Sequence, residues 1–270
     1  MLLVLPAGAA GCGGGGGAER PAASSTGSTP ATTPAAAAPS PARTLADVKT
    51  ALRGVRSFHI DGVQLDADGR TRLAGDFTAA GSLRLHLAVG RSVADLVVVH
   101  DVTYVKANQA YWLSQGKGPA ATKVAQLLAG RWAKLPAAAA GSFKDDLEQL
   151  SPKGLAECVS RGNGTLSSGG VQTLDGRRVR VLIDKGDKPG TNPGRLYVAA
   201  DGKALPLREV QTGRQRPGGT DTRCGDPKST TRQADVRISR YDLPVKITPP
   251  RGALDLDRLQ SGLDPGATPS

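Results

Sequence analysis

The chain has 270 residues, of which 39% are hydrophobic and 3% aromatic, and it carries 35 Lys and Arg against 24 Asp and Glu. This basic surplus suits anionic partners, either nucleic acid or acidic lipid headgroups. Nucleic acid is disfavoured, because so few aromatic residues cannot form base-stacking platforms and no stretch interleaves basic and aromatic side chains.

The N-terminal stretch predicts a processing signal. A short apolar run is followed by small residues and then by Cys12, in the sequence AAGC. Small residues let a peptidase approach the backbone, and the thiol can carry a lipid. The stretch resembles the lipobox of bacterial lipoproteins, which implies that residues 1–12 are a signal-peptide remnant ending at the lipidation site Cys12. The alternative is an unstructured glycine-rich start with an incidental cysteine.

Residues 13–43 are nearly all Gly, Ala, Ser, Thr and Pro. Such a tract has too little large apolar surface to form a core and is expected to be disordered. A flexible chain of this length spans roughly 30 Å, which is suited to a tether between a membrane anchor and a folded domain. We expect that domain to cover residues 44–256, with a disordered tail at 257–270.

The other two cysteines, Cys158 and Cys224, form an even pair in a chain that we expect to be exported. One disulfide is the usual outcome for such a pair. Metal ligation is the competing interpretation, but neither cysteine has a CxxC partner and the histidines lie elsewhere in the sequence. Redox catalysis by these cysteines is disfavoured for the same reason, because it requires a CxxC motif.

The expected domain begins with a helix, TLADVKTALRGV, and continues with segments of period-two alternation. In SLRLHLAV, Leu83, Leu85 and Leu87 share one face, as in a half-buried antiparallel strand. SFHIDGVQL, RTRLAGDFTA, ADLVVVHD and VTYVKA lie at short intervals around it and predict a meander.

A second strand-rich block follows, and in it LDGR and ADGK place Asp-Gly between alternating segments, a strong hairpin signal. Pro249 and Pro250 are expected to end the sheet, because proline cannot donate to a strand ladder. Between the two blocks, PAATKVAQLLAGRW and GSFKDDLEQLSPKGLAECVS have helical spacing. Helix, strands, a helical excursion and further strands together predict an α+β fold.

We expect no catalysis, no metal and no cofactor. No GxSxG elbow, P-loop or HExxH is present. His100 beside Asp101 is better explained as a turn than as a catalytic dyad.

Several motifs resemble the LppX/LprG-type lipoproteins of mycobacteria and related actinobacteria: SFHIDG after the first helix, VVVHDVTYVKA, YWL, RWAKLP, GRLYVAADGKALPLR and YDLPVKITPP. The resemblance implies a curved antiparallel half-barrel sheet, like that of the carrier LolA, with helices covering the concave face. It also implies a lipid, or an acylated glycolipid, held between sheet and helices. The Arg- and Pro-rich segment 213–230 has no counterpart among these motifs.

A curved sheet with more apolar surface than its helices can fill would leave a cavity lined by apolar side chains. We therefore expect the protein to be a lipoprotein on the extracytoplasmic face of the cell membrane, where it binds and carries lipid or another amphiphile. The alternative is a non-catalytic cell-envelope interaction module with a packed core. The candidate lining residues are Phe58, Ile60, Leu83, Leu85, Leu87, Val97, Val99, Leu127 and Leu128.

Overall fold

The computed structural model describes residues 38–67, 69–140, 149–159, 161, 163–220, 224 and 229–263. The predicted signal and lipidation site at 1–12, including Cys12, lie outside the described residues, as does nearly all of the predicted tether. Residues 141–148, most of the helix predicted from GSFKDDLEQL, lie outside them too.

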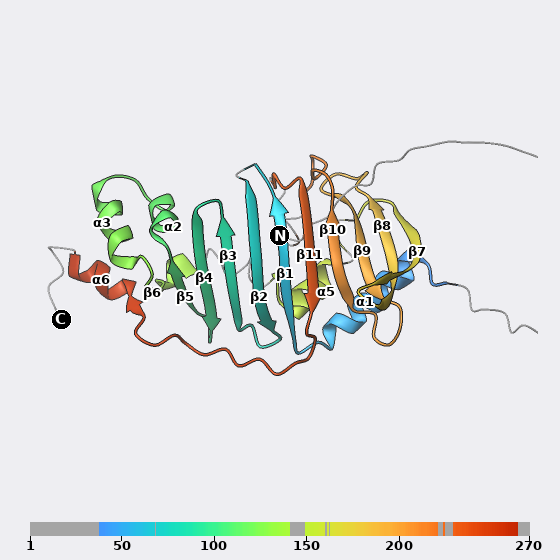
Figure 1. Cartoon of the computed structure of the whole chain (residues 1–270), viewed down its shortest axis with the longest axis horizontal. Helices are drawn as coiled ribbons and strands as arrows, with labels where there is room; N and C mark the ends of the chain where they lie inside the picture. Colours follow the sequence, from blue (N-terminus) through green and yellow to red (C-terminus); the bar gives the residue numbers. More distant parts are fainter. Residues whose placement is uncertain are drawn as a thin grey trace, which may run out of the picture.

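The described part of the chain forms one open sheet of 12 strands in the order β12-β6-β5-β4-β3-β2-β1-β11-β10-β9-β8-β7 (Figure 1). All neighbouring strands are antiparallel except β12 and β6. The strands are β1 (Ser57–Leu65), β2 (Arg70–Thr78), β3 (Leu83–Val89), β4 (Ser92–Val99), β5 (Val102–Ala107), β6 (Trp132–Lys134), β7 (Leu166–Leu174), β8 (Arg177–Lys185), β9 (Pro193–Ala199), β10 (Pro206–Gln211), β11 (Gln233–Ser239) and β12 (Leu254–Asp255).

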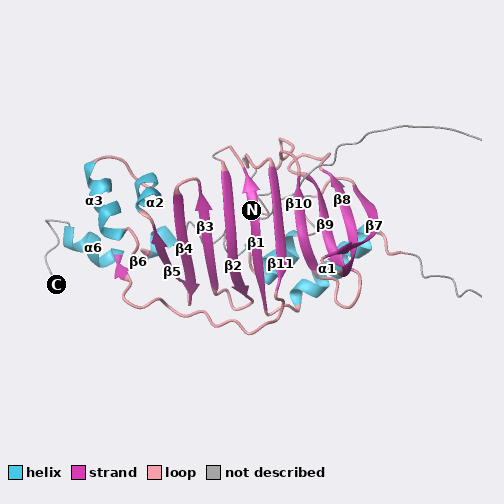
Figure 2. Cartoon of the chain, viewed as in Figure 1, coloured by secondary structure: helices cyan, strands magenta, loops and turns pink. Residues whose placement is uncertain are grey.

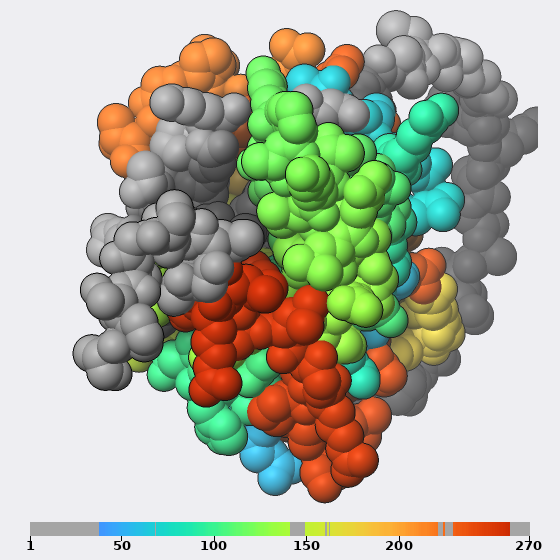
Figure 3. Space-filling view, turned by 90° about the vertical axis from the view of Figure 1, so that its left-hand side faces the viewer, coloured from blue at the N-terminus to red at the C-terminus, as the bar shows by residue number. Residues whose placement is uncertain are grey.

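Helices lie behind this sheet and at one of its ends (Figure 2). They are α1 (Pro41–Arg53), α2 (Gln109–Ser114), α3 (Pro119–Leu128), α5 (Pro152–Cys158) and α6 (Leu256–Leu263). The expected α+β fold, a curved antiparallel half-barrel with helices on its concave face, is therefore confirmed. Helices α2, α3 and α6 gather at the β6 end of the sheet (Figures 1 and 3).

The predicted meander and the second strand-rich block meet where β1 pairs with β11. Their turns follow the local sequence: His100 and Asp101 have φ of 50° and 61°, and Asp175 and Gly176 have φ of 50° and 77°. Positive φ at both central residues is the backbone geometry of two-residue hairpin turns. His100 and Asp101 thus form the β4–β5 turn, as expected.

Local signals also determine where the helices near the sheet begin. Ser40 caps α1, its hydroxyl accepting from the amide of Arg43 at 3.2 Å, so the helix begins at Pro41 rather than at residue 44. Ser151 caps α5 in the same way, through the amide of Gly154. Serine at the N-cap satisfies an amide that would otherwise lack a partner.

The end of the chain differs from the prediction. The last strand of the second block ends at Ser239, and residues 240–253 run along the lower edge of the sheet in Figure 1. The sheet does not end at Pro249 and Pro250, because the chain beyond them forms β12, which pairs in parallel with β6. The Lys134 ammonium lies 2.9 Å from the Asp255 carboxylate and joins these two short strands. Helix α6 then occupies part of the stretch expected to be a disordered tail.

A disulfide joins Cys158, at the end of α5, to Cys224, with their Cα atoms 5.1 Å apart. It links the helical layer to the Arg- and Pro-rich insertion. The amide of Arg216, also in the insertion, donates to the carbonyl of Thr191 at 2.8 Å. The insertion is therefore joined both to α5 and to the loop between β8 and β9. Among the described helices, none is long and apolar enough to cross a membrane.

Candidate functional site

The strand register divides the sheet residues between two faces. Residues directly opposite each other in an antiparallel pair point to the same side. Phe58, Phe77 and Leu83 are paired in this way, and they belong to the main hydrophobic core together with Val48 of α1 and Leu155 of α5. This is the concave face, which the helices cover. The residues between them in sequence, such as His59, Asp76 and Arg84, lie on the convex face.

One row of the concave face is incompletely covered. Six residues are register partners in turn across β9, β10, β11, β1, β2 and β3, and we call them the concave stripe: Leu196, Glu209, Val236, Gly62, Leu73 and Leu87. Val236 is 8% exposed, and the other five are partly exposed. The three leucines pack against the main core from its margin. The stripe is thus a predominantly apolar surface that spans about 24 Å, at ~4.8 Å per strand.

The next row of the same face is closed. It contains Val198, Ile238, Ile60, Leu85 and Leu96, all of them 6% exposed or less. On the other side of the stripe, the register partners Gln211, Ala234 and Gln64 are also buried, at 2–6% exposed, so the stripe lies between two closed rows on β10, β11 and β1.

The expected lining residues divide into three groups. Leu87 lies in the concave stripe. Phe58, Ile60, Leu83, Leu85 and Leu128 are 1–5% exposed within the main core. Val97, Val99 and Leu127 do not face the concave side.

Strand register and helical rotation explain the three misplaced residues. Val97 pairs with Arg84 on β3, which places Val97 and Val99 on the convex face. Leu127 is 44% exposed, whereas its neighbour Leu128 is 1% exposed. Adjacent residues of an α-helix point about 100° apart, so both leucines could not face the sheet.

Glu209 is the residue of the stripe that sequence reasoning missed. Its register partners are Leu196 on β9 and Val236 on β11, so a carboxyl lies between two apolar side chains. Burial raises the pKa of Glu209 to about 8. The signal in the sequence was weak, because both faces of PLREVQ mix polar and apolar residues.

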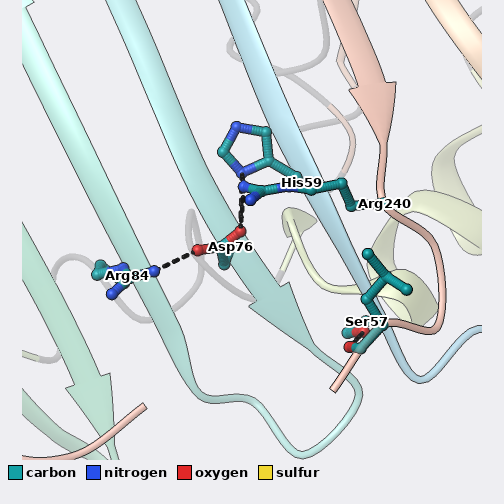
Figure 4. Close-up of polar contacts among 6 residues, drawn as sticks. Ser57, His59, Asp76, Arg84 and Arg240 are labelled. Atoms are coloured by element: carbon teal, nitrogen blue, oxygen red, sulfur yellow. Dashed lines mark hydrogen bonds and ion pairs between the residues drawn. The ribbon is translucent and has the colours of Figure 1, made fainter. Parts of the chain in front are cut away.

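A polar cluster on the convex face surrounds Asp76, which is 6% exposed (Figure 4). One of its oxygens lies 2.7 Å from Arg84 Nη2, and the other lies 2.7 Å from His59 Nδ1 and 2.8 Å from Arg240 Nη2. Burial alone would raise the pKa of Asp76, but hydrogen bonds from Arg84 and His59 and the charge of Arg240 bring it below 3.8. The cluster joins β1, β2 and β3 to the residue that follows β11.

An open pocket of about 270 Å³ lies beside this cluster and includes Trp132 and the His86–Asp95 pair in its lining. Ser57 is near His59 in sequence, but its hydroxyl donates to the carbonyl of Leu243 at 2.6 Å. It is thus not activated by the histidine, as a nucleophile would need to be. The cluster as it stands is a structural ion-pair network.

No protein-family model and no curated protein matches this chain. Solved structures similar to it include LprF from Mycobacterium bovis, with 16% identity, 78% of this chain and 97% of that chain covered, and a TM-score of 0.47. The lipoprotein LppX from Mycobacterium tuberculosis is 13% identical, and the match covers 77% of this chain and 97% of LppX with a TM-score of 0.46. A LolA superfamily protein from Nitrosomonas europaea is 12% identical, and the match covers 77% of this chain and 96% of that protein with a TM-score of 0.27. LppX, a member of the family whose motifs the sequence resembles, is thus among the structures to which this chain is similar.

Proposed function

We propose that the protein is a lipid-anchored cell-envelope lipoprotein that binds an amphiphile along the concave stripe and carries it. The observation that carries this proposal is the open row itself: Leu73, Leu87 and Leu196 remain partly exposed on a face whose next row is closed. A monomer gains free energy by burying such leucines, about 25 cal/mol per Å² of apolar surface. An apolar chain laid across the strands would supply that burial.

The chemistry of the stripe supports a lipid rather than a polar ligand. Ligand sites are concave and mostly apolar, with few polar groups. Here the apolar residues span several strands, and one carboxyl supplies the polar contact. The anchor at Cys12 and a tether of roughly 30 Å would keep such a domain close to a membrane from which lipid can be taken.

The direct test is a titration of the purified chain with a fluorescent fatty-acyl probe. We expect saturable binding that Leu87→Trp weakens by about tenfold or more, because the indole would occupy the stripe. Leu127→Trp is the matched control, since it introduces the same side chain at an exposed position of α3, and it should bind like the wild type. A wild type that fails to bind the probe would favour the packed interaction module.

The anchor has its own test. In an actinobacterial host, the wild type should partition with the membrane fraction and Cys12→Ala should move to the soluble fraction. Equal membrane partition of both proteins would remove the lipid anchor from the proposal without affecting the concave stripe.

A further inference from the structure

Helices α2 and α3 pack against each other at the β6 end of the sheet, and together they expose an apolar surface (Figure 3). Leu113 of α2 is 41% exposed, and Val124 and Leu127 of α3 are 45% and 44% exposed. Val124 and Leu127 share one side of α3, because residues three apart in a helix are neighbours on its surface. Ala125 and Leu128 are buried on another side of the same helix. Three of the six large hydrophobic residues that are exposed in the described part of the chain thus lie on this helix pair.

Cations accompany this apolar surface. Residues 102–144 contain six Lys and Arg but no Asp or Glu. Lys117 in the α2–α3 connection, Lys123 on α3 and Arg131 after α3 are all exposed, and no carboxylate among the described residues forms an ion pair with them. Lys123 is four residues before Leu127 and lies on the same side of α3. We call this surface the helical patch: Leu113, Lys117, Lys123, Val124, Leu127 and Arg131.

The carboxylates that other elements bring to this end of the sheet leave the charge of the patch in place. Asp255 of β12 pairs with Lys134 at 2.9 Å. Helix α6 contributes Asp257 and Arg258, whose charges cancel. Asp95 of β4, the strand that α2 packs against, lies opposite a lysine of β5. The helical patch therefore combines exposed aliphatic side chains with a positive charge.

The composition of the helical patch favours a membrane over a protein as its partner. Exposed apolar patches mark sites of contact with either one. Protein interfaces, however, are depleted in lysine, and Trp and Tyr at their centre dominate the binding energy. The tryptophan of α2, Trp112, is 9% exposed and belongs to the main core. Aliphatic side chains beside lysines are instead typical of surfaces that lie in the headgroup region of an anionic bilayer.

We propose that the helical patch docks on the surface of an anionic membrane. Leu113, Val124 and Leu127 enter the headgroup region, and the cations of the patch contact lipid phosphates. This contact is separate from lipid binding in the concave stripe and does not depend on it. Helix α1, where the described chain begins, starts near β7 at the opposite end of the sheet (Figure 1). Together with the proposed anchor at Cys12, docking would hold both ends of the sheet near the membrane.

A fluorescent label placed in the helical patch tests the docking. The full chain carries Cys12→Ala, which removes the anchor, and Leu127→Cys, which is labelled with the environment-sensitive dye NBD. Cys158 and Cys224 do not react, because they are joined in the disulfide. With vesicles of equimolar phosphatidylcholine and phosphatidylglycerol, we expect the emission to shift to shorter wavelength and to increase severalfold. The same label at Val124→Cys should respond in the same way.

Two controls show that the response is specific. Vesicles of phosphatidylcholine alone should leave the emission of the label at Leu127→Cys nearly unchanged, because they do not attract the cations. The same label at Val171→Cys should not respond to the anionic vesicles. Val171 is 51% exposed but lies on β7, at the other end of the sheet.

Charge variants of the labelled chain test the role of the lysines. Lys117→Ala/Lys123→Ala should lower the affinity for the anionic vesicles about tenfold or more, because each lysine near such a surface contributes about fivefold. Lys185→Ala/Lys188→Ala is the matched control, since it removes two exposed lysines at the β7 end of the sheet, and it should bind like the labelled parent. Raising the salt concentration should weaken the binding of the parent more than that of Lys117→Ala/Lys123→Ala.

The outcomes separate this proposal from the others. A label at Leu127→Cys that does not respond to anionic vesicles, or that responds equally to phosphatidylcholine alone, would overturn membrane docking. Sedimentation of the unlabelled chain as a dimer that Val124→Ser/Leu127→Ser converts to a monomer would also overturn it and assign the patch to a second copy. None of these results affects the concave stripe, which the Leu87→Trp variant tests independently.

Discussion

Leu85 and Leu87 lie two residues apart on the same face of β3, but Leu85 is 5% exposed and belongs to the core, whereas Leu87 belongs to the partly open concave stripe. The space above Gly75 on β2 accounts for part of this difference. A Cβ atom at Gly75 would lie 3.0 Å from Leu85 Cδ1, so the leucine side chain fills the room that the glycine leaves. Leu87 instead lies opposite Leu73, which is itself partly exposed.

Because Leu85 is enclosed and Leu87 is not, the same substitution should lower the free energy of unfolding at Leu85 but not at Leu87. Leu85→Trp should overpack the core and lower the free energy of unfolding by about 1–3 kcal/mol or more. Leu87→Trp should leave it close to the wild-type value, because the indole can extend into open space. Urea unfolding of the two variants measures the difference, and equal losses would mean that the two rows are equally packed.

The disulfide between Cys158 and Cys224 should stabilise the domain through the unfolded state. The two cysteines are 66 residues apart, and closing a loop of this size contributes about 4 kcal/mol in the chain-entropy model. The double variant Cys158→Ala/Cys224→Ala should therefore unfold at a much lower urea concentration than the oxidised wild type. Reduced wild type is the control, and it should behave like the double variant. If reduction leaves the urea midpoint unchanged, the bond contributes nothing to stability.

Period-two alternation predicted the central strands well. SFHIDGVQL and VTYVKA are the observed β1 and β5, because half-buried antiparallel strands alternate along their whole length. β6 and β12, of 3 and 2 residues, are too short to show any period. They exist because Trp132–Lys134 pairs with β5 and Leu254–Asp255 pairs with β6, contacts between residues more than 20 positions apart.

The candidate site was harder to predict than the fold. The run LVVV in β4 has no alternation, so the sequence could not assign Val97 to the convex face. Which of the inward leucines remain partly exposed depends on the helices packed over them, and a strand pattern carries no information about that cover. Glu209 was missed for a related reason, since an inward carboxyl breaks the expected pattern of its strand.

The buried carboxylate of Asp76 should make the protein sensitive to acid. Because the folded pKa of Asp76 is below 3.8, its interactions with Arg84, His59 and Arg240 stabilise the fold above pH 3.8 and are lost as the pH falls through the folded value. Asp76→Asn should cost about 1–3 kcal/mol at pH 6 and show a weaker decline of stability below pH 4.

Asp95→Asn provides the matched control for Asp76. Asp95 pairs with His86 at 2.7 Å, but both side chains are about half exposed. Exposed pairs contribute about 0–1 kcal/mol, so this variant should lose much less. Equal losses in the two variants, measured by urea unfolding from pH 2 to 6, would contradict the role assigned to Asp76.

The raised pKa of Glu209 predicts that the stability of the fold declines as the pH rises, which is opposite to the effect of Asp76. Its pKa is raised from 4.5 to about 8 on folding, so the folded chain holds a proton that the unfolded chain has released between these values. The contribution of Glu209 to stability is present below about pH 4.5, is lost as the pH rises toward 8, and is constant above that. Glu209→Gln cannot titrate, so its stability relative to the wild type should increase from pH 5 to 8. A difference that stays constant over this range would show that folding does not raise the pKa of Glu209.

Native mass spectrometry of the chain purified without detergent or organic solvent tests the central claim, that the concave stripe holds a lipid. The wild type should carry an adduct with the mass of a lipid, and Leu87→Trp should lose most of it while remaining folded. Leu243→Trp, at a site that is 52% exposed outside the stripe, should carry the same adduct as the wild type. A wild type that is bare, or a Leu87→Trp variant that retains its full adduct, would contradict lipid binding along the stripe.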